Sequence, residues 1–219
     1  SGTSFIPGSR IDLDGLGELC RAHGVQLVVD GAQTVGITHI DLARTPVDAM
    51  AMSTQKGLCS VYGMGFLYVR KSLAQTLRPQ SLARFGVDIP ATHEADYDTG
   101  PIVFQQGARR FDLGNYNFLA ATLVKDSLDV LNGIGTAAID SHVTQLAGTL
   151  ATGLDAMGAP VHQPRTGRRS NIVCVQARSG PPAAAALQAF TDVVQAQPGL
   201  RVREMSKGMI VQLHLALVM

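Results

Sequence analysis

The sequence lacks several features that define common protein classes. It has no tryptophan, and its three cysteines, Cys20, Cys59 and Cys174, are odd in number and widely spaced. They offer neither a disulfide framework nor a Cys-x-x-Cys metal-binding pair, so we expect no metal site. No apolar run approaches the roughly 18 residues needed to span a bilayer. We therefore expect a cytoplasmic protein, in a reducing compartment and without a membrane span.

An excess of charge of one sign is also absent. The chain carries 18 basic and 17 acidic residues, and its lysines and arginines form no dense run. This balance gives no reason to expect a nucleic acid or a charged membrane surface as a partner. The 219 residues, 46% of them hydrophobic, are enough to build a core for one large or two small domains.

Two short apolar runs are each followed by polar side chains of the kinds that enzymes use in catalysis. Residues 25–29 read as a buried strand that ends at Asp30, and residues 47–52 read as a second strand followed by Ser-Thr-Gln-Lys, which ends at Lys56. Ligands of open α/β sheets bind at the carboxyl ends of the strands. The sequence therefore predicts an acid and an amine at one rim of a sheet.

The spacing of these residues resembles a known signature. Asp30, Gln33, the 53–56 quartet and the later glycines at 63 and 65 resemble the class V pyridoxal-phosphate enzymes, the aminotransferase and cysteine desulfurase superfamily. The resemblance covers essentially the whole chain. It implies that Lys56 forms the Schiff base with the cofactor and that Asp30 pairs with its pyridinium nitrogen. It further implies that Gln33 bonds the phenolic oxygen, while Ser53 and Gln55 help to hold the phosphate.

Each implied role answers a chemical need. A lysine amine attacks an aldehyde only when it is neutral, which a partly desolvated site favours. The cofactor withdraws electrons only while its ring nitrogen stays protonated, and a carboxylate stabilises that proton. A phosphate needs several donors, which hydroxyl and amide groups supply. Taken alone, Asp30 before a glycine is more often a turn or helix cap than a functional residue.

A motif later in the sequence concerns the association of two subunits. Residues 110–117 resemble the family segment in which the residue after the glycine, here Asn115, contacts the phosphate in the neighbouring subunit. This implies a homodimer with sites at its interface. The alternative is that Asn115 or Asn117 caps the helix that follows.

The fold class we expect is α/β. Residues 1–135 would be part of the large pyridoxal-phosphate-binding domain, a mostly parallel sheet with helices. Residues 136–158 would form a connecting helix, and residues 159–219 a small C-terminal α/β domain. The chain resembles only the carboxyl-terminal part of the family, a little over half of a full-length member. A companion chain supplying the amino-terminal part would complete such a protein.

Periodicity predicts the individual elements. A helix capped by Asp12 or Asp14 runs to His23, with Leu13, Leu16, Leu19 and Cys20 on one face. Later helices cover residues 117–132, with leucines 119, 123, 128 and 131 buried, and a stretch that Thr136 caps, with Ile139, Val143, Leu146, Leu150 and Leu154 buried. The C-terminal part reads as strands at 171–176, 200–203 and 209–214 and a helix at 182–195.

The reaction subtype stays open. Many relatives bind the substrate carboxylate through an arginine in the last strand, where this chain has Ile210; Arg201 or Arg203 could substitute. Residues 203–208 contain no cysteine to accept sulfur, so we rank cysteine desulfuration below transamination, epimerisation or elimination. Residues 114–117 are more similar to the epimerase-like branch, that of isopenicillin N epimerase.

We expect an enzyme that acts on an amino acid or amine through Lys56. The alternative is an incomplete or non-catalytic relative that keeps the fold for binding or assembly.

Overall fold

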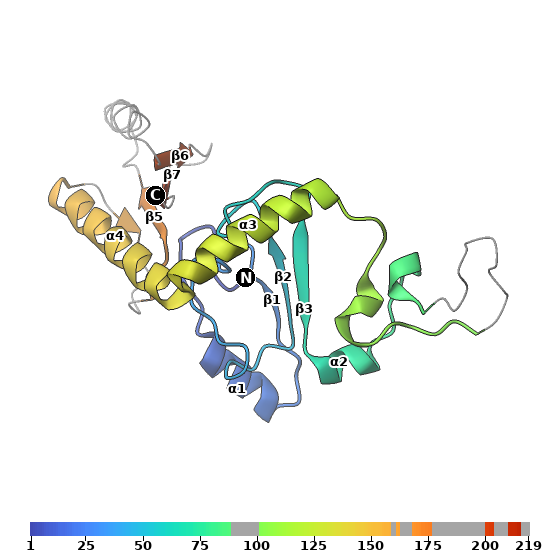
Figure 1. Ribbon diagram of the computed structural model, residues 1–219. Coiled ribbons are helices and arrows are strands. Elements are labelled where there is room, and N and C mark those ends of the chain that lie inside the picture. Colours follow the sequence, from blue (N-terminus) through green and yellow to red (C-terminus); the bar gives the residue numbers. More distant parts are fainter. Residues whose placement is uncertain (89–100, 159–160, 163–167, 177–199, 204–209, 216–219) are drawn as a thin grey trace.

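The structure, a computed structural model, contains two β-sheets connected by helices (Figure 1). It describes residues 1–219 apart from 89–100, 159–160, 163–167, 177–199, 204–209 and 216–219. The α/β class expected from the sequence is confirmed.

The first sheet has the strand order β1-β2-β3 and is mixed. Strand β1 (Val28–Asp30) runs parallel to β2 (Ala49–Ser53), and β2 runs antiparallel to β3 (Gly65–Val69). The prediction of a mostly parallel sheet is therefore not confirmed for these strands. Residues 54–64 are too few for a crossover, which needs about a dozen residues or more, so β3 returns antiparallel.

Helix α1 (Leu13–Ala22) covers one face of this sheet. Of the two candidate caps, Asp12 is the N-cap, since its Oδ1 accepts a hydrogen bond from the Gly15 amide at 3.0 Å. Leu13 packs in a cluster with Leu27, Val29, Val47 and Met50. Leu19, predicted on the buried face, is instead 56% exposed.

The other face is covered in part. A six-residue helix, α2 (Lys71–Thr76), follows β3 directly. Its Leu73 and Ala74 pack with Ala49 and Val69 of the sheet, and Phe111 borders this cluster. Among the described residues that follow α2 are the 3-10 helices η1 (Arg84–Gly86) and η3 (Gly107–Phe111).

Within the described residues, the two long helices are α3 (Phe118–Ile134) and α4 (Thr136–Ala156). Their buried faces match the predicted stripes in part, since Leu131 of α3 and Ile139, Val143 and Leu154 of α4 are buried as predicted. In α3 the buried residues are Ala120, Val124 and Leu131, whereas Leu119 and Leu123 are exposed. The buried residues of α4 are Ile139, Val143, Ala147, Ala151 and Leu154.

Thr136 does not cap α4. The N-cap is Gly135, which makes no side-chain capping bond, and the Thr136 hydroxyl lies 2.8 Å from Nδ1 of His39. The hydroxyl is therefore used for a tertiary contact with the segment that follows β1.

The second sheet is antiparallel, with the order β4-β5-β7-β6. Its strands are β4 (Val161–His162), β5 (Ile172–Gln176), β6 (Leu200–Arg203) and β7 (Ile210–Leu215). Helix α4 packs beside it (Figure 1). The predicted helix at 182–195 lies outside the described residues, and the domain boundaries at 135 and 158 remain a prediction.

The N-terminal segment connects the two sheets. The Gly2 amide donates to the Asp30 carbonyl at the end of β1, while the Ser170 hydroxyl, just before β5, donates to the Gly8 carbonyl. Arg10 then donates two hydrogen bonds, of 2.7 and 2.9 Å, to the Asp140 carboxylate of α4.

Asp140 is the centre of this junction. Its carboxylate also accepts hydrogen bonds from the His39 amide at 3.0 Å and the Thr144 hydroxyl at 3.1 Å. Partial burial acts to raise the pKa of Asp140, but the hydrogen bonds and charge of Arg10, with the His39 amide, outweigh it, so this pKa is lowered.

We predict that Asp140→Asn lowers the free energy of unfolding at neutral pH by about 2 kcal/mol, because the Arg10 guanidinium loses its charged acceptor. The unfolded-state pKa of an aspartate is about 4. Since the folded-state pKa is lower, the carboxylate stabilises the fold above about pH 4, and this contribution is lost as the pH falls through the folded-state pKa. Denaturant titrations of wild type and variant at several pH values should therefore converge in acid.

The control is Asp129→Asn. Asp129 pairs with Lys125 on the exposed side of α3, where an ion pair contributes at most about 0.5 kcal/mol. A loss in Asp140→Asn no larger than in this control would contradict the role given to Asp140.

Candidate functional site

The structure places the predicted acid and the predicted amine at the same edge of the first sheet. In the parallel register Asp30 lies opposite Ala51, two residues before β2 ends at Ser53. The chain segments that carry Asp30 and Lys56 therefore leave adjacent strands in the same direction, and both side chains are exposed. Oδ1 of Asp30 accepts a hydrogen bond of 2.9 Å from the Ala32 amide, which orients the carboxylate.

The segment after Asp30 is a pair of helical turns. The amides of Thr34 and Val35 both donate to the Gly31 carbonyl at 2.9 Å, and the Thr38 amide donates to the Thr34 carbonyl. Gln33, within these turns, is only 6% exposed. We call residues 31–38 the glutamine turn.

Residues 54–64 connect β2 to β3 and carry Lys56; we call them the lysine loop. Its Leu58 is 4% exposed and packs with Leu131 of α3 and Ile139 of α4. The Ser127 hydroxyl of α3 donates to the Cys59 carbonyl at 3.1 Å. Cys59 has φ +52°, a left-handed conformation that is unusual for a residue other than glycine. The loop is thus tied to α3 next to Lys56.

The glutamine turn and the lysine loop touch through their backbones. A Cβ added to Gly36 would lie 2.2 Å from the Gly57 carbonyl oxygen, and a Cβ added to Gly57 would lie 2.4 Å from the Val35 carbonyl oxygen. Real Cβ atoms do not approach other atoms so closely, so both positions require glycine. This contact fixes Gln33 and Lys56 relative to each other.

Two hydroxyl oxygens of this region have no partner. Oγ of Ser53 and Oγ of Ser60 are buried and form no hydrogen bond within the described part of the chain. Buried hydroxyl groups nearly always have a partner, so an absent acceptor such as a phosphate oxygen suits them. Together with the oriented carboxylate of Asp30 and the exposed amine of Lys56, these hydroxyls fit a phosphorylated aldehyde cofactor.

The other predicted cofactor-binding residues are Gln55, in the lysine loop, and Asn115, in the segment before α3. Gln55 is half-buried in the lysine loop. Asn117 is the N-cap of α3, its Oδ1 accepting from the Ala120 amide at 3.0 Å, so Asn115 is not the cap. Asn115 is exposed, and its predicted contact in a neighbouring subunit stays a prediction.

The predicted carboxylate-binding position lies in the second sheet. Ile210 is in β7 opposite Gln176, and Arg201 and Arg203 are in β6 opposite His214 and Gln212. The roles suggested for them rest on the sequence alone. Residues 204–208, which lack a cysteine, lie outside the described residues.

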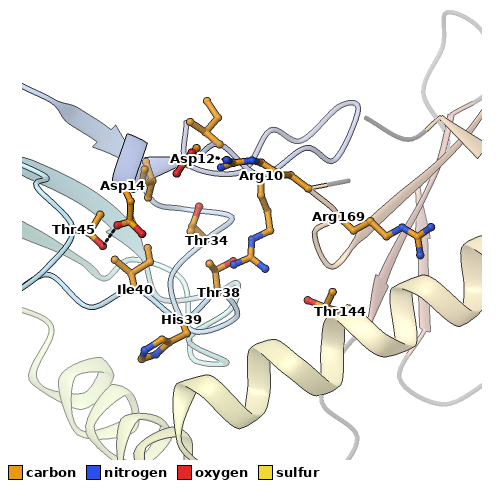
Figure 2. A pocket seen from close by; sticks show the side chains of 14 residues that line it. Arg10, Asp12, Asp14, Thr34, Thr38, His39, Ile40, Thr45, Thr144 and Arg169 are labelled. Carbon is orange, nitrogen blue, oxygen red and sulfur yellow. Dashed lines mark hydrogen bonds and ion pairs between the residues drawn. The ribbon is translucent and has the colours of Figure 1, made fainter. Parts of the chain in front are cut away.

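A separate cavity of about 360 Å³ lies between the N-terminal segment, the glutamine turn and α4 (Figure 2). Its charges are largely compensated within the chain. Arg168 donates to Asp12 and lowers the pKa of this carboxyl to about 2, the Thr45 hydroxyl donates to Asp14, and Arg10 pairs with Asp140. None of Asp30, Ser53 and Lys56 lines it, so we do not place the reaction there.

The described part of the chain contains no group of three or more histidine, cysteine, aspartate or glutamate residues that could hold a metal ion. Among the same residues, no helix is long and apolar enough to cross a membrane.

Similar sequences point to one family. Residues 2–206 match the family described as aminotransferase class-V. The chain is 35% identical over 132 residues to the uncharacterized aminotransferase YcbU of Bacillus subtilis (strain 168), a match that covers 60% of this chain and 33% of YcbU. It is 25% identical over 154 residues to a probable cysteine desulfurase of Pyrococcus abyssi (strain GE5 / Orsay), covering 70% of this chain and 37% of that protein.

A solved structure has the same fold. A C-DES variant with glycine covalently linked to the PLP cofactor superposes with a TM-score of 0.77 at 19% identity, over 98% of this chain and 54% of that one. The chain thus spans about a third of the curated relatives and about half of this solved structure.

The polar residues of the candidate site were predicted from the sequence, but the residues that support them were missed. Gly36, Gly57 and Leu58 hold the glutamine turn and the lysine loop together. The only signal in the sequence was the glycine directly after Lys56, which a single sequence does not distinguish from an ordinary loop glycine.

We predict that Gly57→Ala lowers the free energy of unfolding by about 3 kcal/mol, because the new methyl group would overlap the Val35 carbonyl. The matched control is Gly153→Ala in α4, where nothing lies within 4 Å of the added Cβ. This control should raise the stability by up to about 1 kcal/mol, since alanine favours a helix. Chemical denaturation of both variants tests the contact, and changes of the same sign and size would contradict it.

Proposed function

Because the chain belongs to the class V aminotransferase family, we propose that it forms the part of a pyridoxal-phosphate enzyme that holds the cofactor through Lys56. The observation that carries this proposal is the arrangement of Asp30, Ser53 and Lys56 at one rim of the first sheet, where the buried Ser53 hydroxyl has no hydrogen-bond partner among the described residues. Pyridoxal phosphate, when bound, withdraws electrons from the α-carbon of an amino acid or amine attached to its aldehyde.

The proposed division of roles follows from the chemistry of each side chain. Lys56 supplies the amine that binds the aldehyde and, once released from it, carries a proton to or from the α-carbon. Asp30, oriented by the Ala32 amide, holds a proton on the ring nitrogen. The buried Gln33 amide lies in the glutamine turn, from which it can donate to the phenolic oxygen.

The phosphate would be held at the start of the lysine loop. Ser53 and Gln55 are the proposed donors in this chain, and the Ser60 hydroxyl, buried without a partner, is available beside them. Asn115 of a second copy would add a donor in the homodimer that we propose. A companion polypeptide, or another part of a longer chain, would complete the large domain, because this chain spans only part of its relatives.

We propose an amino acid or amine as the substrate and transamination, epimerisation or elimination as the reaction. Cysteine desulfuration is the second candidate, because a probable cysteine desulfurase is among the similar proteins. A non-catalytic relative is the alternative from another class. The intact set of Asp30, Gln33, Ser53 and Lys56 favours an enzyme, since a protein that did not bind the cofactor would have no chemical need for all four.

We predict that borohydride reduction in the presence of pyridoxal phosphate attaches a pyridoxyl group to Lys56, because its exposed amine lies beside the proposed phosphate donors. Peptide mass spectrometry should find this label on Lys56 in the wild type and lose it in Lys56→Ala. Lys125→Ala, which removes another exposed lysine, is the control and should leave the Lys56 label intact.

Equal labelling of Lys56 and Lys125 would indicate nonspecific reaction and contradict the proposed site. No label on Lys56 in a folded preparation would mean that this chain alone does not assemble the site, which favours the non-catalytic alternative or a need for the companion part.

A further prediction separates the two candidate reactions. In a preparation in which Lys56 is labelled, incubation with amino acids and a 2-oxo acid should consume the amino acid, while L-cysteine should release no sulfide above the Lys56→Ala background. The reason is that residues 203–208 contain no cysteine to accept sulfur. Release of sulfide from L-cysteine that depends on Lys56 would favour the desulfurase.

A further inference from the structure

Thr54 is the first residue of the lysine loop and is completely buried. It follows the last residue of β2, and its side chain has an exposed fraction of 0%. Lys56, two residues later, is exposed. The sequence analysis gave Thr54 no role of its own within the Ser-Thr-Gln-Lys quartet.

The side chain of Thr54 closes the base of the loop. Its hydroxyl donates to the Val61 carbonyl at 2.7 Å and lies 3.1 Å from the Met64 carbonyl, so one proton is shared between two acceptors. Val61 and Met64 lie in the half of the loop that returns to β3. The hydroxyl therefore joins the two halves of the loop on either side of Lys56.

The backbone of Thr54 adds to this closure. The Ser60 amide donates to the Thr54 carbonyl at 3.0 Å, and the Thr54 amide donates to the Met64 carbonyl at 3.4 Å. Between these bonds the loop makes a tight turn, in which the Cys59 amide donates to the Lys56 carbonyl at 2.9 Å. Lys56 is thus an exposed residue of a loop that is fixed at its base by the buried Thr54.

We propose that Thr54 is a positioning residue that fixes the lysine loop so that the Lys56 amine faces the rim that carries Asp30. The link to the cofactor rests on the proposed function of Lys56. Removal of the hydroxyl takes its donor from the Val61 carbonyl and leaves the Met64 carbonyl with only the 3.4 Å bond from the Thr54 amide. This loss favours openings of the loop in which Lys56 leaves the rim.

The test compares Thr54→Val, which keeps the shape but removes the hydroxyl, with Thr54→Ser, which keeps the hydroxyl. The control is Thr45→Val: Thr45 is also buried, at 7% exposed, and its hydroxyl donates to Asp14 away from the lysine loop. Thr54→Cys, with a weaker donor of similar size, replaces Thr54→Val if the latter does not fold.

The first readout is amide hydrogen exchange at Ser60 and Cys59, which needs no cofactor. We expect exchange at these amides to rise about tenfold in Thr54→Val beyond any change in global stability, corresponding to one lost hydrogen bond. Thr54→Ser should match the wild type, and Thr45→Val should leave these amides unchanged. Unchanged exchange in Thr54→Val, or an equal rise in Thr45→Val, would overturn the proposal.

The second readout is the pyridoxal phosphate concentration that gives half-maximal borohydride labelling of Lys56. It should increase about tenfold in Thr54→Val and be restored in Thr54→Ser, whereas equal values in wild type and Thr54→Val would overturn the positioning role. Absence of label in the wild type would instead count against assembly of the cofactor site by this chain alone, and hydrogen exchange would still decide whether Thr54 fixes the loop.

Discussion

The candidate site depends on the close contact between the glutamine turn and the lysine loop. Gly36 and Gly57 bring two backbone segments together without side chains between them. The glutamine turn follows β1 and the lysine loop follows β2, and these strands are neighbours in the first sheet. The contact between the two segments therefore fixes the position of Gln33 relative to Lys56. Leu58 extends it into the cluster formed with α3 and α4, so the site is supported by the helices as well as by the sheet.

The second requirement is that the two sheets are joined. The N-terminal segment contacts the end of β1 through Gly2 and the start of β5 through Gly8, and Arg10 ties it to α4 through Asp140. The Asp140 carboxylate also accepts a hydrogen bond from the amide of His39, the residue directly after the glutamine turn. The junction between the sheets is therefore continuous with the segment that carries Gln33.

The spacing of apolar residues in the sequence predicted the buried face of helix α3 only in part. Leucines 119, 123, 128 and 131 form a regular stripe, yet Leu119 and Leu123 are exposed and the smaller Ala120 and Val124 are buried. An apolar helix has more than one face that satisfies a three-to-four spacing, and the neighbouring segments decide which of them is covered. In the view of Figure 1, α3 is one long helix that passes in front of β2 and β3, and its Phe118, Leu119 and Leu123 are exposed.

The sequence by itself determined the family and predicted the polar residues of the candidate site, because Asp30, Gln33 and the 53–56 quartet follow apolar runs at a spacing that the family shares. It also predicted the strands β5, β6 and β7 and the N-cap candidates, since these depend on residues close together in the chain. Only the tertiary structure decided that β3 runs antiparallel to β2, that Gly57 packs against the Val35 carbonyl, and that Asp140 pairs with Arg10. Those outcomes depend on contacts between segments distant in the sequence, and local composition does not encode which segments meet.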